Sequence, residues 1–250
     1  MQIETPPRIE APVQDGTRAG DGPAQPRSFK LRRGRGTAGQ RAALQTLRPR
    51  YGIDPGEGPL DPERLFGRRA PLVLEIGFGM GEATLALATA EPDRDVIAVD
   101  VHTPGVGALL RDAAARDLRN VRVLEGDALA LLRDRLAPGT LDELRLFFPD
   151  PWPKTRHHKR RLFSPAFARL AATRLRPGGR LHCATDWTPY AEQMLAVVAG
   201  EPLLVNAHDG WAPRPAWRPE TRYERQGLAL GRTIHDLLAH RVTDVTVDHP

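Results

Sequence analysis

Residues 72–90 read LVLEIGFGMGEATLALATA, and the pattern of this stretch decides the fold. The first five residues are apolar except for Glu75, as in a strand that is buried on both faces of a sheet. A GxGxG loop begins at Gly77, where glycine lets the backbone turn sharply and approach a ligand closely. Apolar residues at helical spacing follow from Glu82, so the stretch predicts a strand, a turn and a helix.

The same alternation of apolar runs and helical patterns continues along the chain. Six further strands are expected, at residues 96–99, 121–124, 144–148, 180–184, 203–206 and within 228–241. Between them we expect helices capped by Thr103 and Ser164 and a helix over residues 129–136, whereas residues 211–226 are expected to form a loop. The alternation predicts an α/β protein with a Rossmann-like, seven-stranded, mostly parallel sheet and helices on both faces.

Composition divides the chain into three parts. Residues 1–26 contain five prolines and few large apolar residues, and they are expected to form a disordered tail because they cannot offset the entropy of ordering. Residues 27–40, RSFKLRRGRGTAGQ, concentrate cations and are expected to form a flexible basic arm. Residues 41–250 are expected to form one domain, which begins with a short helix over residues 41–51 and contains no internal repeat.

Charge and cysteine content limit the partners and the compartment. The formal net charge of +5 favours an anionic partner such as nucleic acid. The single cysteine, Cys183, excludes an internal disulfide and a zinc site made of cysteines alone. No stretch has the pattern of a signal peptide or the length of a membrane span. We therefore expect a cytoplasmic protein, a monomer or homodimer, with no membrane association and no obligatory protein partner.

A second informative stretch, residues 147–162, reads FFPDPWPKTRHHKRRL. Its three prolines end the preceding strand and stiffen a loop that carries Asp150 and Trp152. Six consecutive basic or titratable side chains follow at positions 156–161. A solvated charge run is the ordinary interpretation of such a cluster. A rigid acidic and aromatic loop beside it favours a site that handles a nucleobase attached to a phosphate backbone.

An acidic residue stands at the end of each of four predicted strands: Glu75, Asp100, Asp127 and Asp150. For each acid alone, helix capping or simple solvation is as good an explanation as ligand binding. Together they are expected to point into one crevice, because α/β sheets bind ligands at the carboxyl ends of their strands. Asp100, about 20 residues after the glycine loop, suits the hydroxyls of a ribose, and Asp127 suits an adenine edge. The GxGxG spacing favours S-adenosylmethionine over NAD, whose sites tend to show GxGxxG.

These motifs resemble the bacterial-type tRNA (guanine-N7-)-methyltransferase family, whose members have the class I S-adenosylmethionine-dependent methyltransferase fold. The resemblance is carried by RSFKLRRGRGTAGQ, LEIGFGMGEATLALA, VDVHTPGVGALL, FFPDPWPKTRHHKRRL, ATDW and RPETRYERQG, which together span most of residues 27–241. It implies transfer of a methyl group from S-adenosyl-L-methionine to N7 of a guanosine in the variable loop of tRNA. Residues 221–224 read TRYE where many members have TKFE, a difference that keeps the charge and the ring.

The resemblance also implies roles for individual residues. It implies that the cofactor is contacted by Glu75, Gly77, Gly79, Asp100, Asp127 and Asp150. It implies that the target nucleotide is received by Lys154, Asp186, Thr221, Arg222, Tyr223 and Glu224. It implies that RNA is contacted by Arg156, His157, His158, Lys159, Arg160 and Arg161. No metal site is expected, because the two histidines have no further ligand at a suitable spacing.

The chemistry of guanine N7 agrees with these roles. N7 already has a lone pair in the plane of the ring, so methyl transfer to it requires no general base. Methylation places positive charge on the purine, and acids at the acceptor edge stabilise that charge. Asp150 is the expected catalytic residue, with Asp186 as the second candidate. Trp152 or Trp187 is a candidate for stacking on the target base, although core packing explains Trp187 equally well.

Three other functions remain open from the sequence. One is a methyltransferase of the same fold that acts on DNA, protein or a small molecule. Another is an RNA-binding module without catalytic activity, against which the four strand-end acids speak. The third is a nicotinamide-dependent oxidoreductase, which the glycine spacing disfavours.

Overall fold

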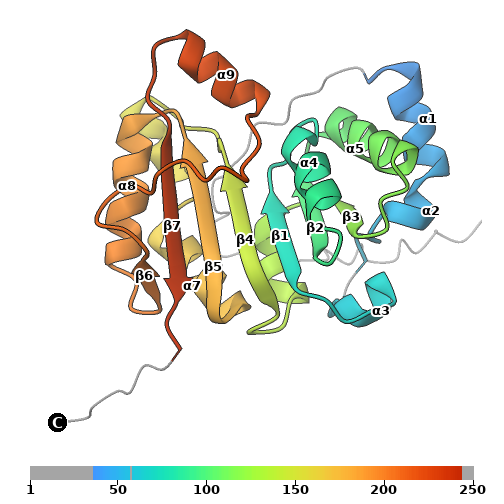
Figure 1. Ribbon diagram of the computed structural model, residues 1–250, viewed down its shortest axis with the longest axis horizontal. Helices are drawn as coiled ribbons and strands as arrows, with labels where there is room; N and C mark the ends of the chain where they lie inside the picture. Colours follow the sequence, from blue (N-terminus) through green and yellow to red (C-terminus); the bar gives the residue numbers. More distant parts are fainter. Residues whose placement is uncertain (1–35, 57, 244–250) are drawn as a thin grey trace, which may run out of the picture.

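The computed structural model describes residues 36–56 and 58–243 (Figure 1). Its centre is a seven-stranded sheet with the strand order β3-β2-β1-β4-β5-β7-β6. The strands are β1 Leu72–Ile76, β2 Asp95–Asp100, β3 Val121–Glu125, β4 Leu141–Phe147, β5 Leu175–Thr185, β6 Leu204–Asn206 and β7 His235–Arg241. The first five are parallel, and β7 runs antiparallel to both β5 and β6. The prediction of a seven-stranded, mostly parallel sheet is confirmed.

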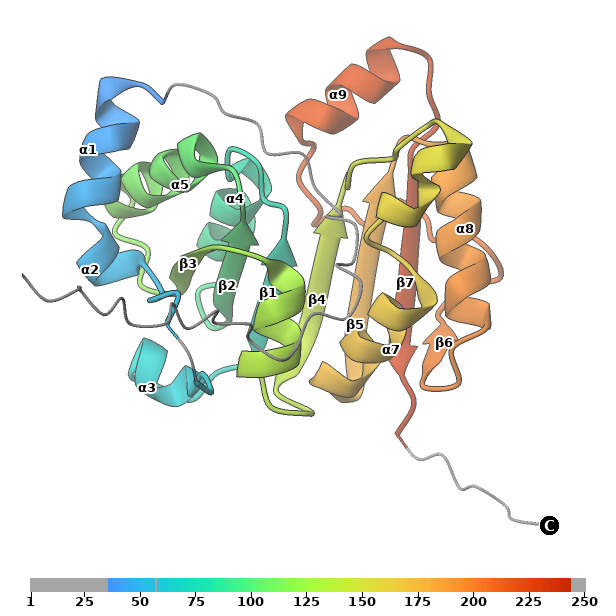
Figure 2. The same ribbon diagram turned by 180° about the vertical axis from the view of Figure 1, so that it is seen from behind.

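Helices cover both faces of the sheet (Figures 1 and 2). The helical elements are α1 Ala38–Thr46, α2 Arg48–Tyr51, α3 Pro62–Phe66, α4 Glu82–Ala90, α5 Thr103–Ala115, α6 Ala128–Ala130, η1 Leu131–Arg135, η2 Thr155–Arg160, α7 Pro165–Arg174, α8 Thr188–Ala199 and α9 Arg222–Ala229. Helices α1, α4 and α5 pack on one face, and η1, α7 and α8 pack on the other. Helix α9 stands apart from both layers, above the carboxyl ends of the parallel strands (Figure 1).

The two cores follow from the period of two along each strand. Leu74 and Ile76 of β1 belong to the cluster with α7 and α8, whereas Val73 belongs to the cluster with α4 and α5. Because neighbouring side chains of a strand point to opposite faces, an uninterrupted apolar run fills both cores. The only acid within this run is Glu75, which is also buried. A fully buried acid is rare unless it is paired, so Glu75 is a candidate for a ligand-binding residue.

The amino-terminal boundary of the folded part differs from the expected one. Residues 1–35, which include the expected tail and most of the expected basic arm, lie outside the described residues. The expected arm extended to Gln40, but helix α1 begins at Ala38. Thr37 and Gln40 form a reciprocal capping box, in which each side chain accepts from the other residue's backbone N–H. Gln40 also packs against Gly107 of α5, so the described end of the arm belongs to the domain.

Several expected element boundaries were wrong, each for a local reason. Thr103 does not cap α5, because its hydroxyl donates to Glu125 and the N-cap position is His102. The helix expected over residues 129–136 is a short α6 followed by the π-helical η1. Strand β4 stops at Phe147, since Phe148 has a positive φ of 52° that no strand accommodates.

The carboxyl-terminal segment held the largest error in secondary structure. Residues 211–226 were expected to form a loop, and the last strand was sought within residues 228–241. Helix α9 instead begins at Arg222, within the expected loop, whereas the expected last strand is confirmed as β7, which begins at His235. Thr221 caps α9 by accepting a hydrogen bond from the backbone N–H of Glu224. The Thr-x-x-Glu spacing is the signature of such a cap and was the signal available in the sequence.

Candidate active site

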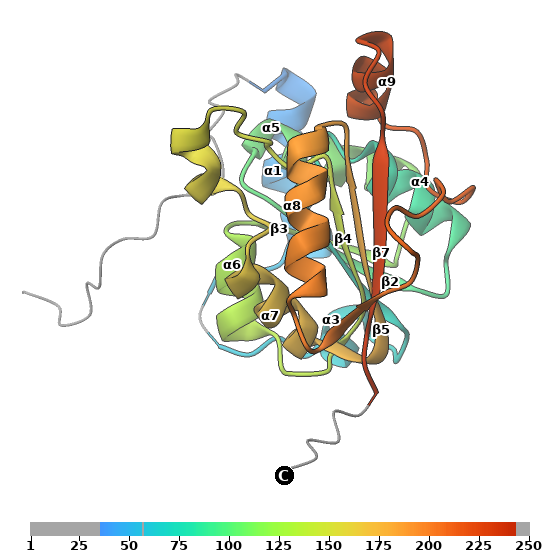
Figure 3. The same cartoon turned by 90° about the vertical axis from the view of Figure 1, so that its left-hand side faces the viewer.

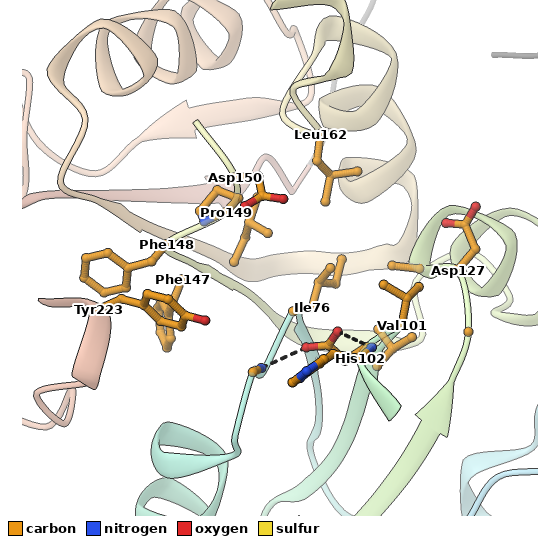
Figure 4. Close-up of a pocket in the computed structure, with 17 residues that line it drawn as sticks. Ile76, Val101, His102, Asp127, Phe147, Phe148, Pro149, Asp150, Leu162 and Tyr223 are labelled. Carbon is orange, nitrogen blue, oxygen red and sulfur yellow. Dashed lines mark hydrogen bonds between the residues drawn. The ribbon is translucent and has the colours of Figure 1, made fainter. Parts of the chain in front are cut away.

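A cavity opens at the carboxyl ends of β1, β2, β3 and β4, and Tyr223 from the first turn of α9 is part of its lining (Figure 4). Its lining includes six of the residues expected at a cofactor or substrate site: Gly77, Gly79, Asp100, Asp127, Asp150 and Tyr223. Three strand-end acids therefore do converge on one cavity. Glu75, the fourth, lines an adjoining cavity that shares Gly77 and Tyr223 with the first.

Asp100 organises the glycine loop. Its carboxylate accepts hydrogen bonds from the backbone N–H of Gly79 at 2.8 Å and of His102 at 2.9 Å (Figure 4). Gly79 has a φ of +60°, which residues with a Cβ rarely adopt. Burial raises the pKa of the Asp100 carboxyl, and the two backbone donors partly oppose that effect. A half-buried acid at the end of β2 is thereby held at the cavity wall.

The shape of the loop also depends on Gly105, which was not among the predicted site residues. A Cβ on Gly105 would lie 1.9 Å from the carbonyl oxygen of Gly79, closer than any real contact. Only glycine lets α5 approach the loop this closely. The TPGVG stretch at residues 103–107 was the available signal, because two glycines inside a helix lower its intrinsic stability and need a packing reason.

Asp127 and Asp150 line two further sides of the cavity. Asp127 caps α6 by accepting from the backbone N–H of Leu129 at 2.9 Å, so the capping interpretation and the lining role hold together. Asp150 is half-buried and follows Phe148, whose backbone N–H donates to Ala184 of the neighbouring strand at 2.7 Å. Figure 4 shows Asp150 and Pro149 above the cavity, opposite Asp127.

Glu75 is 2% exposed, and its Oε2 has no hydrogen-bond partner among the described residues. Burial raises its pKa to about 7, and the positive charge of Arg145 only partly opposes the rise. A buried carboxylate oxygen with spare capacity, next to a glycine loop, suits a cationic or hydrogen-donating ligand. These features fit the amino-acid portion of S-adenosylmethionine, which carries an ammonium group.

We expect Glu75→Gln to stabilise the protein above neutral pH. The folded-state pKa of about 7 exceeds the ordinary value of 4.5, so the folded state binds more protons between these values and loses stability as pH rises through 7. That difference in pKa corresponds to roughly 3 kcal/mol of unfolding free energy. Urea unfolding of parent and variant at pH 5.5 and pH 8 measures about 2 kcal/mol of it, because pH 5.5 already lies between the two pKa values. A stability difference that is the same at both pH values would contradict it.

The basic side chains at positions 156–161 differ in their exposure to solvent. Arg156 and Lys159 are exposed on η2, and Arg160 lies over the ring of Trp152 at 5.0 Å. Arg161 is only 5% exposed, so the structure places it away from the surface on which RNA contact was expected. Its guanidinium donates to the carbonyl of Pro151 at 2.8 Å. It also donates to Gln193 at 2.7 Å and lies over the Tyr190 ring, so it ties the Asp150 loop to α8.

Neither tryptophan proposed for base stacking presents a free ring. Trp152 is 5% exposed, with Arg160 over one part of its ring and His157 edge-on at 5.8 Å. Trp187 is half-buried, and Arg232 lies over it at 5.4 Å. Packing therefore explains both rings in this structure.

The residues expected to receive the nucleotide fall into three groups. Thr221, Arg222 and Tyr223 line the second cavity at the start of α9. Lys154 is exposed and Asp186 accepts from Arg232 at 2.7 Å, and neither of them lines the first two cavities. Glu224, by contrast, is 1% exposed and is held in ion pairs with arginines.

The described part of the chain has neither a cluster of metal ligands nor a helix that could span a membrane. Residues 36–56 and 58–243 contain no group of three or more potential metal ligands. No helix among the described elements is long and apolar enough to cross a membrane.

Comparisons with known proteins agree on the kind of protein. Residues 69–237 match a family described as "Putative methyltransferase". A tRNA (guanine-N(7)-)-methyltransferase of Streptomyces avermitilis is 58% identical over 218 residues, covering 86% of this chain and 75% of the relative. One of Paracidovorax citrulli is 50% identical over 240 residues, covering 95% and 96%. The fold is similar to that of the 16S rRNA methyltransferase KamB, with a TM-score of 0.57, 21% identity, and coverage of 77% and 99%.

Proposed function

The chain belongs to the tRNA (guanine-N7-)-methyltransferase family, and from this membership we propose that its cavity binds S-adenosylmethionine beside a guanosine of tRNA. The protein is an enzyme that transfers a methyl group from S-adenosylmethionine to N7 of guanine in tRNA. We further propose that the target guanosine lies in the variable loop. The observation that best supports the proposal is the convergence of strand-end acids on one cavity next to a glycine loop.

The cofactor is proposed to lie along the carboxyl ends of β1, β2 and β3. Asp100 would bind the ribose hydroxyls, Asp127 the adenine edge, and Gly77 and Gly79 would let the backbone approach. Glu75 would bind the ammonium group from the adjoining cavity. S-adenosylmethionine supplies an electrophilic methyl group on a sulfonium sulfur when it is bound.

Asp150 is proposed to stabilise the charge that appears on guanine. N7 attacks with an existing lone pair, so no side chain has to remove a proton first. The purine becomes positively charged as its new bond forms, and a carboxylate held at the cavity wall lowers the energy of that state. Asp150 is placed there by the proline loop, by the Phe148 bond to β5 and by Arg161 on the neighbouring carbonyl. Asp186 is proposed to support the same charge from outside the cavity lining.

Two surfaces beside the cavity are proposed to bind the tRNA. One is η2 with Arg156, Lys159 and Arg160, assisted by His157, His158 and the basic residues before α1. The other is the start of α9, with Arg222 and Tyr223, whereas Lys154 immediately precedes η2 and belongs to the first surface. Figure 3 shows η2, coloured yellow, and α9 on opposite sides of the upper end of the molecule. A polyanion that lies across this end would place one nucleotide over the cavity.

Methylation of tRNA by the purified chain alone tests the function and the absence of an obligatory partner together. We expect N7-methylguanosine to appear when tRNA is incubated with the protein and labelled S-adenosylmethionine, with no other protein added. Nucleoside mass spectrometry identifies the modified base, and nuclease mapping shows whether it lies in the variable loop. Duplex DNA of equal concentration serves as the competing substrate. Label on DNA or protein but not on tRNA would contradict the proposal.

A further inference from the structure

Helix α9 reaches the cavities through its first residues, although it packs little against the rest of the molecule. Tyr223 lines both cavities, and its ring is the neighbour that a Cβ on Gly79 would meet, at 3.4 Å. Leu228 and Leu230 at the other end are 49% and 68% exposed. Figure 1 shows the helix projecting beyond the sheet. Something other than a hydrophobic face must therefore hold its amino end in place.

A buried ionic cluster lies directly beneath that end. Arg218 is 1% exposed and donates to both oxygens of Glu224, at 2.6 and 3.0 Å. The same guanidinium donates to Asp236 of β7 at 3.0 Å. It thus joins Glu224, the third residue of α9, to the sheet. Arg214 completes the cluster from the solvent side with a bond to Glu224 at 2.6 Å.

The two acids of the cluster, Glu224 and Asp236, need the positive charge of Arg218 to compensate their own. Glu224 and Asp236 are each 1% exposed, and an uncompensated charge at such a position is strongly destabilising. His182 lies 2.7 Å from Asp236, but burial lowers the pKa of that imidazole and disfavours its charged form. A guanidinium can bind two carboxylates at once through its planar fork, which an ammonium cannot reproduce.

The cluster also touches the cavity floor. The Arg218 guanidinium lies 5.9 Å from the centre of the Phe147 ring and 5.8 Å from that of Phe148. Both phenylalanines line both cavities. Two further contacts hold α9. Glu82 accepts from the backbone of Arg222 and pairs with Arg225, and because all three are exposed this is a weak anchor. The buried Gly227 packs against the side chain of Asp186, but it lies beyond the amino end of the helix.

We infer that Arg218 is a positioning residue, which holds the start of α9 and with it Tyr223 over the glycine loop by bridging Glu224 to Asp236. Glu224 then acts through Arg218 and not by contact with guanine, because its carboxylate is occupied and buried. The inference rests on the proposed binding of S-adenosylmethionine in the cavity beneath Tyr223. In this arrangement α9 covers the bound cofactor and is more than a passive surface helix.

Arg218→Lys tests the inference, since lysine keeps the charge but not the fork. We expect the Kd for S-adenosylmethionine to rise about tenfold, within the range for residues of one ion-pair network. Amide hydrogen exchange should accelerate in residues 219–230 and stay unchanged in β1, β2 and β3. The tRNA Kd should rise less than that for S-adenosylmethionine, because the phosphate contacts proposed for η2 remain. Calorimetry and mass spectrometry of the full chain supply these values without requiring methyl transfer.

Leu136→Ala is the matched control for a general loss of stability. Leu136 is 3% exposed and follows η1, away from α9, and its truncation opens a core cavity. We expect this variant to unfold at lower temperature with an unchanged Kd for S-adenosylmethionine. If Arg218→Lys behaves in the same way, with no selective change in residues 219–230, Arg218 is structural only and the inference is overturned.

A double-mutant cycle of Arg218→Lys and Glu224→Gln tests whether Glu224 acts through Arg218 or independently of it. If both side chains act through one bridge, the double variant should be little worse than either single variant in its Kd for S-adenosylmethionine. Additive losses would show that Glu224 acts independently of Arg218 and would overturn the assignment. Absence of methylation on any tRNA would refute the proposed function, yet would leave the binding and exchange results interpretable.

Discussion

Asp150→Asn is expected to lower kcat about 10²–10³-fold. Removal of one oxyanion-hole donor, which stabilises a developing negative charge, has an effect of this size, and Asp150 is proposed to stabilise a developing positive charge in the same way. The substitution keeps the shape of the side chain and removes the negative charge at the moment when the purine becomes cationic. Binding of tRNA should weaken far less, because phosphate contacts dominate affinity. Single-turnover methyl transfer at saturating tRNA and cofactor measures the chemical step apart from product release.

The matched control for the charge change is Asp134→Asn. Asp134 lies in η1, its side chain is 52% exposed, and it pairs with the adjacent Arg133. That variant should transfer methyl at the parent rate. If Asp150→Asn also does so, Asp150 is structural, and the stabilising acid must be sought elsewhere.

Asp186→Asn distinguishes shared from separate action of the two acids. Asp186 is already paired with Arg232 and lies outside the cavity lining, so its charge is partly neutralised in this structure. If both acids face the guanine, the double variant should lose less activity than the product of the two single losses. Independent losses would place Asp186 in another step, such as holding the nucleotide.

The second large effect is expected for Arg156, Lys159 and Arg160 replaced together by alanine. If each contacts one phosphate, the slope of log affinity against log salt should fall by roughly two to three, and affinity for tRNA by about 100-fold near physiological salt. Affinity for S-adenosylmethionine should be unchanged, because none of the three lines the cavity. Filter binding over a salt series and calorimetry provide the two values.

Arg161 is left intact in that variant because its burial would confuse loss of RNA contact with loss of the loop's anchor. A triple alanine variant of Arg64, Arg69 and Arg119 removes the same charge from exposed positions on α3 and just before β1 and β3. Since these positions lie at the amino ends of parallel strands, they are opposite the cavity. Equal losses of tRNA affinity in both triple variants would remove η2 from the proposed interface.

Local patterns along the chain are enough to predict the layered architecture and the edge of the sheet that carries the site. Strand period, glycine turns and helix caps act within a few residues, so their patterns can be read without a fold. Gly79, for example, needs its positive φ wherever the loop lies, and its position after β1 places it at a carboxyl end. The acids at 100, 127 and 150 were predictable for the same reason.

Only the tertiary structure decided which charged side chains face a ligand and which serve the core. Arg161 stands among exposed cations in the sequence, but Gln193, 32 positions later, and Tyr190 bury it. Glu224 reads as one more polar residue of TRYE, yet Arg218 and Asp236 occupy it beneath α9. A charge is either solvated or paired, and the partner that decides comes from packing between distant segments. Local patterns carry no information about such pairing.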